Sequence, residues 1–164
     1  MGWFTKKRQL VTTPPVMAEL LHRICAVEDQ AQATPETYDL PLAFHERFRA
    51  KVFLYREAMV LRNLVLQAKK EPLLHQTQLE YERIVFPNSP ETPSGAARLQ
   101  EMKAAMADLG TLVDPDKDKK LTWCRQWFQA IGYDEPDPVS LAIFLAFFAD
   151  HYVAVHDSVK AMVK

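Results

Sequence analysis

Residues 42 to 70 read LAFHERFRAKVFLYREAMVLRNLVLQAKK, and this stretch decides the fold. It contains neither glycine nor proline, so helix propensity is favourable throughout. From Val52 to Leu66 it is apolar almost all round, and polar residues recur seven apart, at Arg49, Arg56, Asn63 and Lys70. Because seven residues make two helical turns, they predict one narrow polar stripe on a helix covered elsewhere by neighbours. We therefore expect a central helix over 42–70.

The composition favours a single all-α domain. The chain has 164 residues, of which 48% are hydrophobic and 25% charged, as in an ordinary globular domain. It contains 4 glycines and 11 prolines, which suits helices joined by stiff loops better than it suits strands joined by glycine-rich turns. The net charge of −1 argues against nucleic acid as a partner.

Proline marks where the helices begin. Five times a residue that can cap a helix stands directly before a proline, at Thr13, Thr34, Thr92, Asp114 and Asp137. Proline suits the first helical position because the N–H group that it lacks has no partner there. With the apolar periodicity, these starts predict helices over 14–32, 42–70, 73–86, 93–109, 115–131 and 138–163.

We thus expect an irregular all-α bundle of five to six helices around a long central helix (42–70) and a long C-terminal helix (138–163). Residues 1–12 are expected to form a loose N-terminal arm, and 13–164 a single domain. A proline-rich loop, PNSPETPSG, is expected at 87–95 because it is dense in turn-forming residues.

The first predicted helix carries a Glu-x-x-His spacing at Glu19 and His22. Such a pair contributes to carboxylate-bridged metal sites in helical bundles, but those sites need a second pair that this chain lacks. Both residues fall on the polar side of the helix, so a surface pair is the better interpretation. The expected buried stripe of this helix is Val16, Leu20, Ile24, Val27 and Ala31.

A second metal candidate is the run Asp114, Asp116 and Asp118, which resembles the opening of a calcium-binding loop. The glycine and the bidentate glutamate of such a loop are replaced by Lys119 and Arg125. We interpret Asp114 instead as the cap of a helix that starts at Pro115, with the other two carboxylates near the positive end of its dipole. No metal site is predicted.

Charged residues on the two longest helices are complementary. Asp150 and Asp157 share one face of the last helix, and Arg49 and Arg56 share one face of the central helix. A structural interpretation is an Arg–Asp pairing that fixes the register of the two helices. The functional alternative is a ligand-binding site, in which Arg49 and Arg56, with Asp150 and His151, hold an anionic ligand between the helices.

Catalytic chemistry finds little support. The chain has no G-x-S-x-G, P-loop or G-x-G-x-x-G motif, and Cys25 and Cys124 lie in apolar patterns that disfavour a thiolate. We predict no catalytic residue and no cofactor. The N-terminal sequence lacks a long apolar segment, and the uncharged run 138–149 is too short to cross a membrane, so we expect a cytoplasmic protein without a transmembrane segment.

Three functions remain. The first is a non-catalytic interaction, adaptor or regulatory protein, whose surplus of apolar helix surface is buried against a protein partner or in a homodimer. The second is a carrier of a small molecule or cofactor, with haem as one candidate, in an interhelical pocket lined by the aromatic residues of the last helix. The third is a metal-dependent enzyme built on scattered histidines and carboxylates. We place the interaction protein first.

Overall fold

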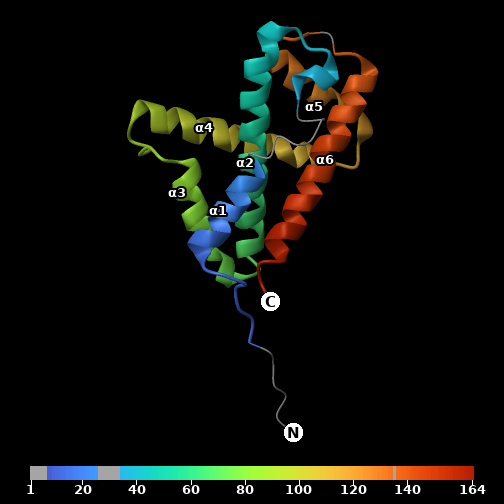
Figure 1. The fold of residues 1–164 in the computed structure, drawn as a ribbon. Helices are drawn as coiled ribbons and strands as arrows, with labels where there is room; N and C mark the ends of the chain where they lie inside the picture. The colour runs from blue at the N-terminus through green and yellow to red at the C-terminus, as the bar shows by residue number, and fades with distance from the viewer. Residues whose placement is uncertain (1–6, 26–33, 135) are drawn as a thin grey trace.

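The computed structural model describes residues 7–25, 34–134 and 136–164, which form six α-helices and no β-strand (Figure 1). This confirms the all-α fold. The helices are α1 (Pro14–Cys25), α2 (His45–Ala68), α3 (His75–Val85), α4 (Pro93–Asp108), α5 (Lys117–Ala130) and α6 (Pro138–Lys160). Short 3-10 helices cover Pro35–Tyr38, Leu42–Phe44, Pro72–Leu74 and Leu109–Val113. Residues 1–6 of the expected arm and 26–32 of the expected first helix lie outside the described residues.

The helix α2 is the centre of the molecule and packs against α1, α3, α4 and α6 (Figure 1). Its residues from Tyr55 to Leu61 are all buried, so neighbours surround its middle. The expected polar stripe is wrong at two of its positions, since Arg56 and Asn63 are buried. Asn63 Nδ2 donates to the Met59 carbonyl at 2.8 Å, and this hydrogen bond makes its burial tolerable.

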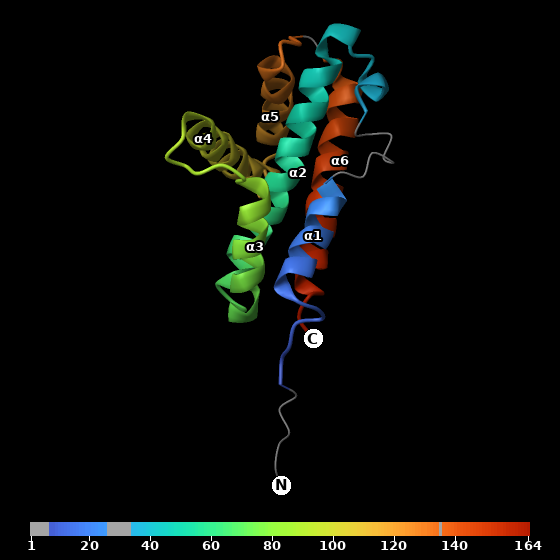
Figure 2. The ribbon, with the colours of Figure 1, turned by 60° about the vertical axis from the view of Figure 1, so that its left-hand side comes forward.

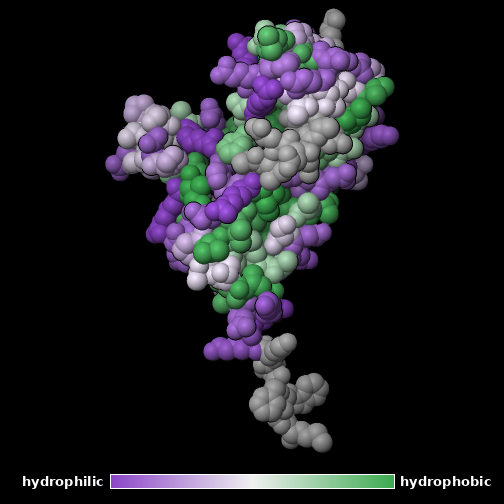
Figure 3. Space-filling model, viewed as in Figure 1, coloured by the Kyte–Doolittle hydropathy of each residue, from purple (hydrophilic) through white to green (hydrophobic). Residues whose placement is uncertain are grey.

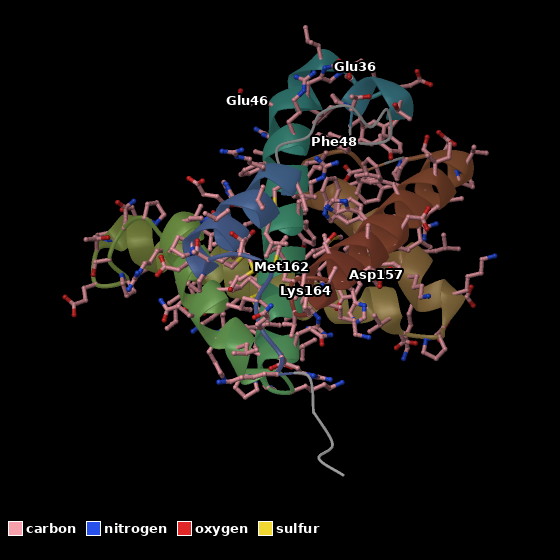
Figure 4. All side chains as sticks on the ribbon, turned by 60° about the horizontal axis from the view of Figure 1, so that its bottom comes forward. Glu36, Glu46, Phe48, Asp157, Met162 and Lys164 are labelled. Carbon is pink, nitrogen blue, oxygen red and sulfur yellow. The ribbon has the colours of Figure 1, made fainter. Side chains whose placement is uncertain are left out.

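An aromatic cluster joins α5 and α6 to the N-terminal half of α2. Phe144 lies at its centre and is fully buried, with its ring centroid 4.6 Å from Trp127, 4.8 Å from Phe128 and 4.6 Å from Phe148. Phe48 brings α2 into the same cluster, 5.5 Å from Trp127 (labelled in Figure 4). Most of these pairs are tilted or edge-to-face, the geometries that aromatic quadrupoles favour.

On the other side of α2, α1 packs against α3, and α4 points away from the bundle axis (Figures 1 and 2). The predicted buried stripe of α1 is wrong at Val16 and Leu20, which are 45% and 46% exposed. Its buried residues are Met17, Ala18, Leu21 and Cys25. The helix is therefore rotated by about one residue from the expected orientation. Val27 and Ala31 lie outside the described residues.

Two of the predicted caps are confirmed and one is displaced. Thr92 Oγ1 accepts from the Gly95 N–H at 3.1 Å, and an Asp137 carboxylate oxygen accepts from the Ser140 N–H at 2.9 Å. At α5 the cap is Asp116 rather than Asp114, because Asp116 accepts from the Asp118 N–H at 2.9 Å. The sequence pattern placed the start of this helix two residues too early.

The N-terminal segment before α1 is paired with the C-terminal residues. The Val11 N–H donates to the Met162 carbonyl at 2.9 Å, and the Lys164 N–H donates to the Gln9 carbonyl at 2.9 Å. Met162 and Lys164 are labelled in Figure 4. Residues 9–11 are therefore held against the end of the chain and are not the loose arm that we expected.

Phe144→Ala removes the ring at the centre of the aromatic cluster. We expect the free energy of unfolding to fall by about 3–5 kcal/mol, because the large cavity left behind adds to the lost burial of the side chain. Chemical denaturation monitored by circular dichroism measures the change. Leu42→Ala, at a residue that is 82% exposed, is the matched control and is expected to change it by less than about 0.5 kcal/mol. Equal stability of the two variants would contradict the central role of Phe144.

Candidate functional site

The structure brings together two of the four residues predicted to bind a ligand. Arg56 on α2 and His151 on α6 are both buried and both contact the ring of Phe147. The Arg56 guanidinium lies 5.4 Å from the centroid of the Phe147 ring, and the His151 ring stacks on that ring at 6.0 Å. Arg56 Nη1 also donates to the Cys25 carbonyl at 3.2 Å, which ties α2 to α1. These contacts make Arg56 and His151 part of the interior between the helices.

The other two predicted residues lie on the surface. Arg49 Nη2 is 3.1 Å from Glu36 Oε1, near the N-terminal end of α2, where Figure 4 labels Glu36. Asp150 is exposed on the outer side of α6, and Asp157 lies 3.4 Å from Nδ1 of its neighbour His156. The ion pair that Arg49 makes is therefore with Glu36, rather than the expected one with an aspartate of α6.

His151 is held in its neutral form. Burial, followed by the positive charge of Arg56, lowers the pKa of its imidazole from 6.5 to about 4. Its Nε2 atom is buried and has no hydrogen-bond partner among the described residues. A neutral ring stacked on Phe147 behaves as a packing group, and protonation would place a second positive charge beside Arg56.

This depressed pKa makes stability depend on pH. The unfolded chain takes up a proton at His151 near pH 6.5, whereas the folded protein resists protonation until about pH 4. The unfolded state therefore binds more protons between these values, and the fold loses up to about 3 kcal/mol as the pH falls through this range. We expect His151→Gln to remove most of that loss in denaturation curves measured from pH 7 to pH 4. The exposed His75→Gln is the control, and an equal effect of both variants would contradict the assignment.

A polar cluster that the sequence analysis missed lies between α1, α2 and α4. The Glu57 side chain is only 3% exposed, and each of its carboxylate oxygens meets a basic group. Oε1 accepts from Arg98 Nη2 at 2.6 Å, and Oε2 lies 3.1 Å from His22 Nε2. His22 therefore pairs with Glu57, while Glu19 lies 3.9 Å from Arg23, so the surface pair of Glu19 and His22 that we expected is wrong.

Neighbouring groups fix this cluster, which we call the Glu57 cluster (Glu57, His22 and Arg98). Tyr81 donates its hydroxyl to the Glu57 backbone carbonyl at 3.1 Å, and Arg98 Nε donates to the Val85 carbonyl at 3.2 Å. An open cavity of about 460 Å³ lies against the cluster and is bounded by α1, α2, α3, α4 and the segment between α3 and α4. One signal in the sequence could have drawn attention to it, namely a carboxylate at position 57 within the apolar run of the central helix.

The two cysteines offer no activated nucleophile. Both are buried free thiols, and burial raises the pKa of Cys25 to about 11 and that of Cys124 to about 12. Both remain protonated near neutral pH. Among the described residues, no group of three or more histidine, cysteine, aspartate or glutamate side chains is placed to hold a metal ion.

The outer side of α6 is a second candidate site. Seven of its exposed residues recur with alternating spacings of four and three, which place them along one edge of the helix. Val139 is 68% exposed, Ile143 38% and Val153 58%. We call this edge the outer α6 stripe, and it consists of Val139, Ile143, Ala146, Asp150, Val153, Asp157 and Lys160. Figure 3 shows hydrophobic side chains at the surface along α6 and also over α1.

The composition of α6 is unusual for a helix with so much exposed surface. Among the described residues it is the one helix that is long and apolar enough, by length and composition, to cross a membrane. Our expectation considered only 138–149, whereas the helix continues to Lys160. Only 39% of the most apolar stretch of α6 is buried. Core helices of soluble proteins can be equally long and apolar, but they are mostly buried. Much of this apolar helix therefore faces outward.

Comparisons with protein-family models, with curated proteins and with solved structures found no significant match for this chain. A function must therefore be argued from the outer α6 stripe and the Glu57 cluster themselves.

Proposed function

We propose that this protein is a non-catalytic interaction protein that associates with a second copy of itself through the outer α6 stripe. The observation that carries the proposal is the exposure of Val139, Ile143 and Val153 along one edge of the most apolar helix. Exposed apolar residues that gather along one edge of a helix are typical of a binding site. The opposite side of α6 packs on α2 and α5, so the stripe is the side of the helix that remains available to a partner.

A second copy suits the stripe because the stripe is complementary to itself when two α6 helices run antiparallel. In the register that places Ile143 opposite Val153 of the second copy, Ala146 faces Asp150 and leaves room for its side chain. Asp137, at the start of α6, then lies near Lys160 of the second copy. Opposite charges therefore meet at both ends of the contact, and between them Ile143 meets Val153 twice, while Val139 faces Asp157.

Charge also favours a protein partner over a lipid bilayer. Asp150 and Asp157 lie within the stripe and are exposed. Carboxylates are costly in hydrocarbon, and they are repelled by anionic headgroups. In a helix pair, the same side chains can remain at the wet edge of the contact.

A single helix edge buries less than a standard protein interface, so we expect a weak, concentration-dependent dimer. The proposal includes the cytoplasm as its location.

The test is the dependence of mass on concentration, measured by sedimentation equilibrium and by native mass spectrometry. We expect the unmodified chain to dimerise and Ile143→Glu to remain monomeric, because it places two buried carboxylates next to apolar side chains. Leu42→Glu makes the same change at an exposed leucine outside the stripe and is expected to dimerise normally. A monomer at every concentration, or equal dimerisation of both variants, would overturn the proposal.

A substitution that strengthens the dimer tests the same register in the opposite direction. Asp150→Ala removes two like charges near the middle of the proposed contact. We expect its dissociation constant to fall by about ten-fold, because the two Asp150 carboxylates then no longer repel each other across the contact. If the unmodified chain instead sediments with phosphatidylcholine vesicles and Ile143→Glu does not, the stripe is a lipid-binding surface and the dimer is rejected.

A further inference from the structure

The cavity beside the Glu57 cluster lies on the opposite side of α2 from the aromatic cluster, and the proposed dimer does not use it. It combines an apolar wall with basic groups. The wall consists of Phe53, Ile84, Val85 and Pro87. His22 and Arg98 line the same cavity, and their side chains are 29% and 27% exposed, so both are accessible from it.

The hydrogen bonds within the cluster leave one nitrogen of Arg98 available to a ligand. Arg98 uses Nη2 for Glu57 and Nε for the Val85 carbonyl, and among the described residues no acceptor engages its third nitrogen, Nη1. These two contacts also fix the guanidinium in place, so little side-chain entropy is lost when it binds a ligand. His22 turns Nε2 to Glu57, and its other ring nitrogen is directed away from that carboxylate.

The charges indicate which ligand fits. The guanidinium of Arg98 carries a permanent positive charge at the wall of the cavity, and its Nη1 group is left for an anionic acceptor. An ion pair with a purely structural role needs no cavity next to it, yet about 460 Å³ of open volume lies against this one. A ligand with one negative group for Arg98 and an apolar body for the wall would satisfy both features.

We propose that the cavity between α1, α2, α3 and α4 binds a small monocarboxylate with an apolar body. The carboxylate accepts hydrogen bonds from Arg98 Nη1, and the apolar body lies against Phe53 and Ile84. Glu57 is a positioning residue, which holds the guanidinium and the imidazole at the wall of the cavity. The segment between α3 and α4, predicted from the sequence as an exposed proline-rich loop, contributes Pro87 and Asn88 to the lining of the cavity.

Three probes of equal length test the charge preference, namely hexanoate, hexanol and hexylamine, titrated into the full chain and followed by amide chemical shifts in NMR spectra. We expect hexanoate to bind about ten-fold more tightly than hexanol and hexylamine to bind most weakly, because only the carboxylate makes charge-assisted hydrogen bonds with Arg98. The shifts should centre on residues that line the cavity. Equal affinity for the three probes, no binding of hexanoate, or shifts centred elsewhere would overturn the proposal.

Variants then separate binding from folding. Arg98→Gln is expected to weaken hexanoate binding by about ten-fold, whereas Arg23→Gln, which removes the same charge from an exposed arginine beside His22, should change it by less than about two-fold. Because Arg98→Gln also leaves Glu57 without its closest partner, a second variant keeps that pair intact. Ile84→Trp fills the cavity from α3, and we expect it to abolish hexanoate binding while cooperative thermal unfolding is retained. Undiminished binding by a folded Ile84→Trp would overturn the proposal even if Arg98→Gln fails to fold.

Discussion

The burial of a carboxylate inside the central helix is the constraint on which the rest of this structure depends. Glu57 lies in the part of α2 that is covered on all sides, where an isolated negative charge is very costly. The cost is offset because α1 supplies His22 and α4 supplies Arg98, each to a different oxygen of the same carboxylate. His22 and Arg98 lie 35 and 41 residues from Glu57 in the sequence. Their contacts with Glu57 therefore fix the positions of α1 and α4 on α2.

The N-terminal half and the middle of α2 are held in place by different kinds of contact. Its N-terminal half belongs to the aromatic cluster, where Phe48 packs with Trp127 and Phe144 and the contacts are apolar. Its middle is linked by polar contacts, with Arg56 bonded to the Cys25 carbonyl and Tyr55 donating to Asp108 at 2.6 Å. Apolar packing supplies most of the burial energy, and the directional contacts decide which face of each neighbour meets the helix.

Much of the fold could be predicted from the sequence because it is encoded locally. The central and C-terminal helices are continuous apolar stretches, and Thr92 and Asp137 cap helices where a capping residue precedes proline. The orientation of α1 could not be predicted, because the stripes through Val16 and Met17 differ by one residue and both are apolar. Packing of α1 against α3 and α2 places Met17 in the interior.

The candidate sites were less predictable because polarity alone does not indicate exposure. The heptad spacing placed Arg56 and Asn63 on a wet face, yet both are buried and donate to backbone carbonyls. The Glu57 cluster depends on contacts between distant segments, which no local pattern contains. Of the four predicted ligand residues, Arg56 and His151 meet around Phe147, whereas Arg49 pairs with Glu36 and Asp150 faces outward.

The pairing of Gln9 with Lys164 has a consequence for how this unit can be joined to others. Because the strand-like segments at 9–11 and 162–164 run antiparallel and exchange backbone hydrogen bonds, the polypeptide enters and leaves the bundle at one point. A host protein would need only a short opening in one of its surface turns to accept the whole bundle as an insert. The bundle would then be joined to its host where residues 9–11 pair with 162–164.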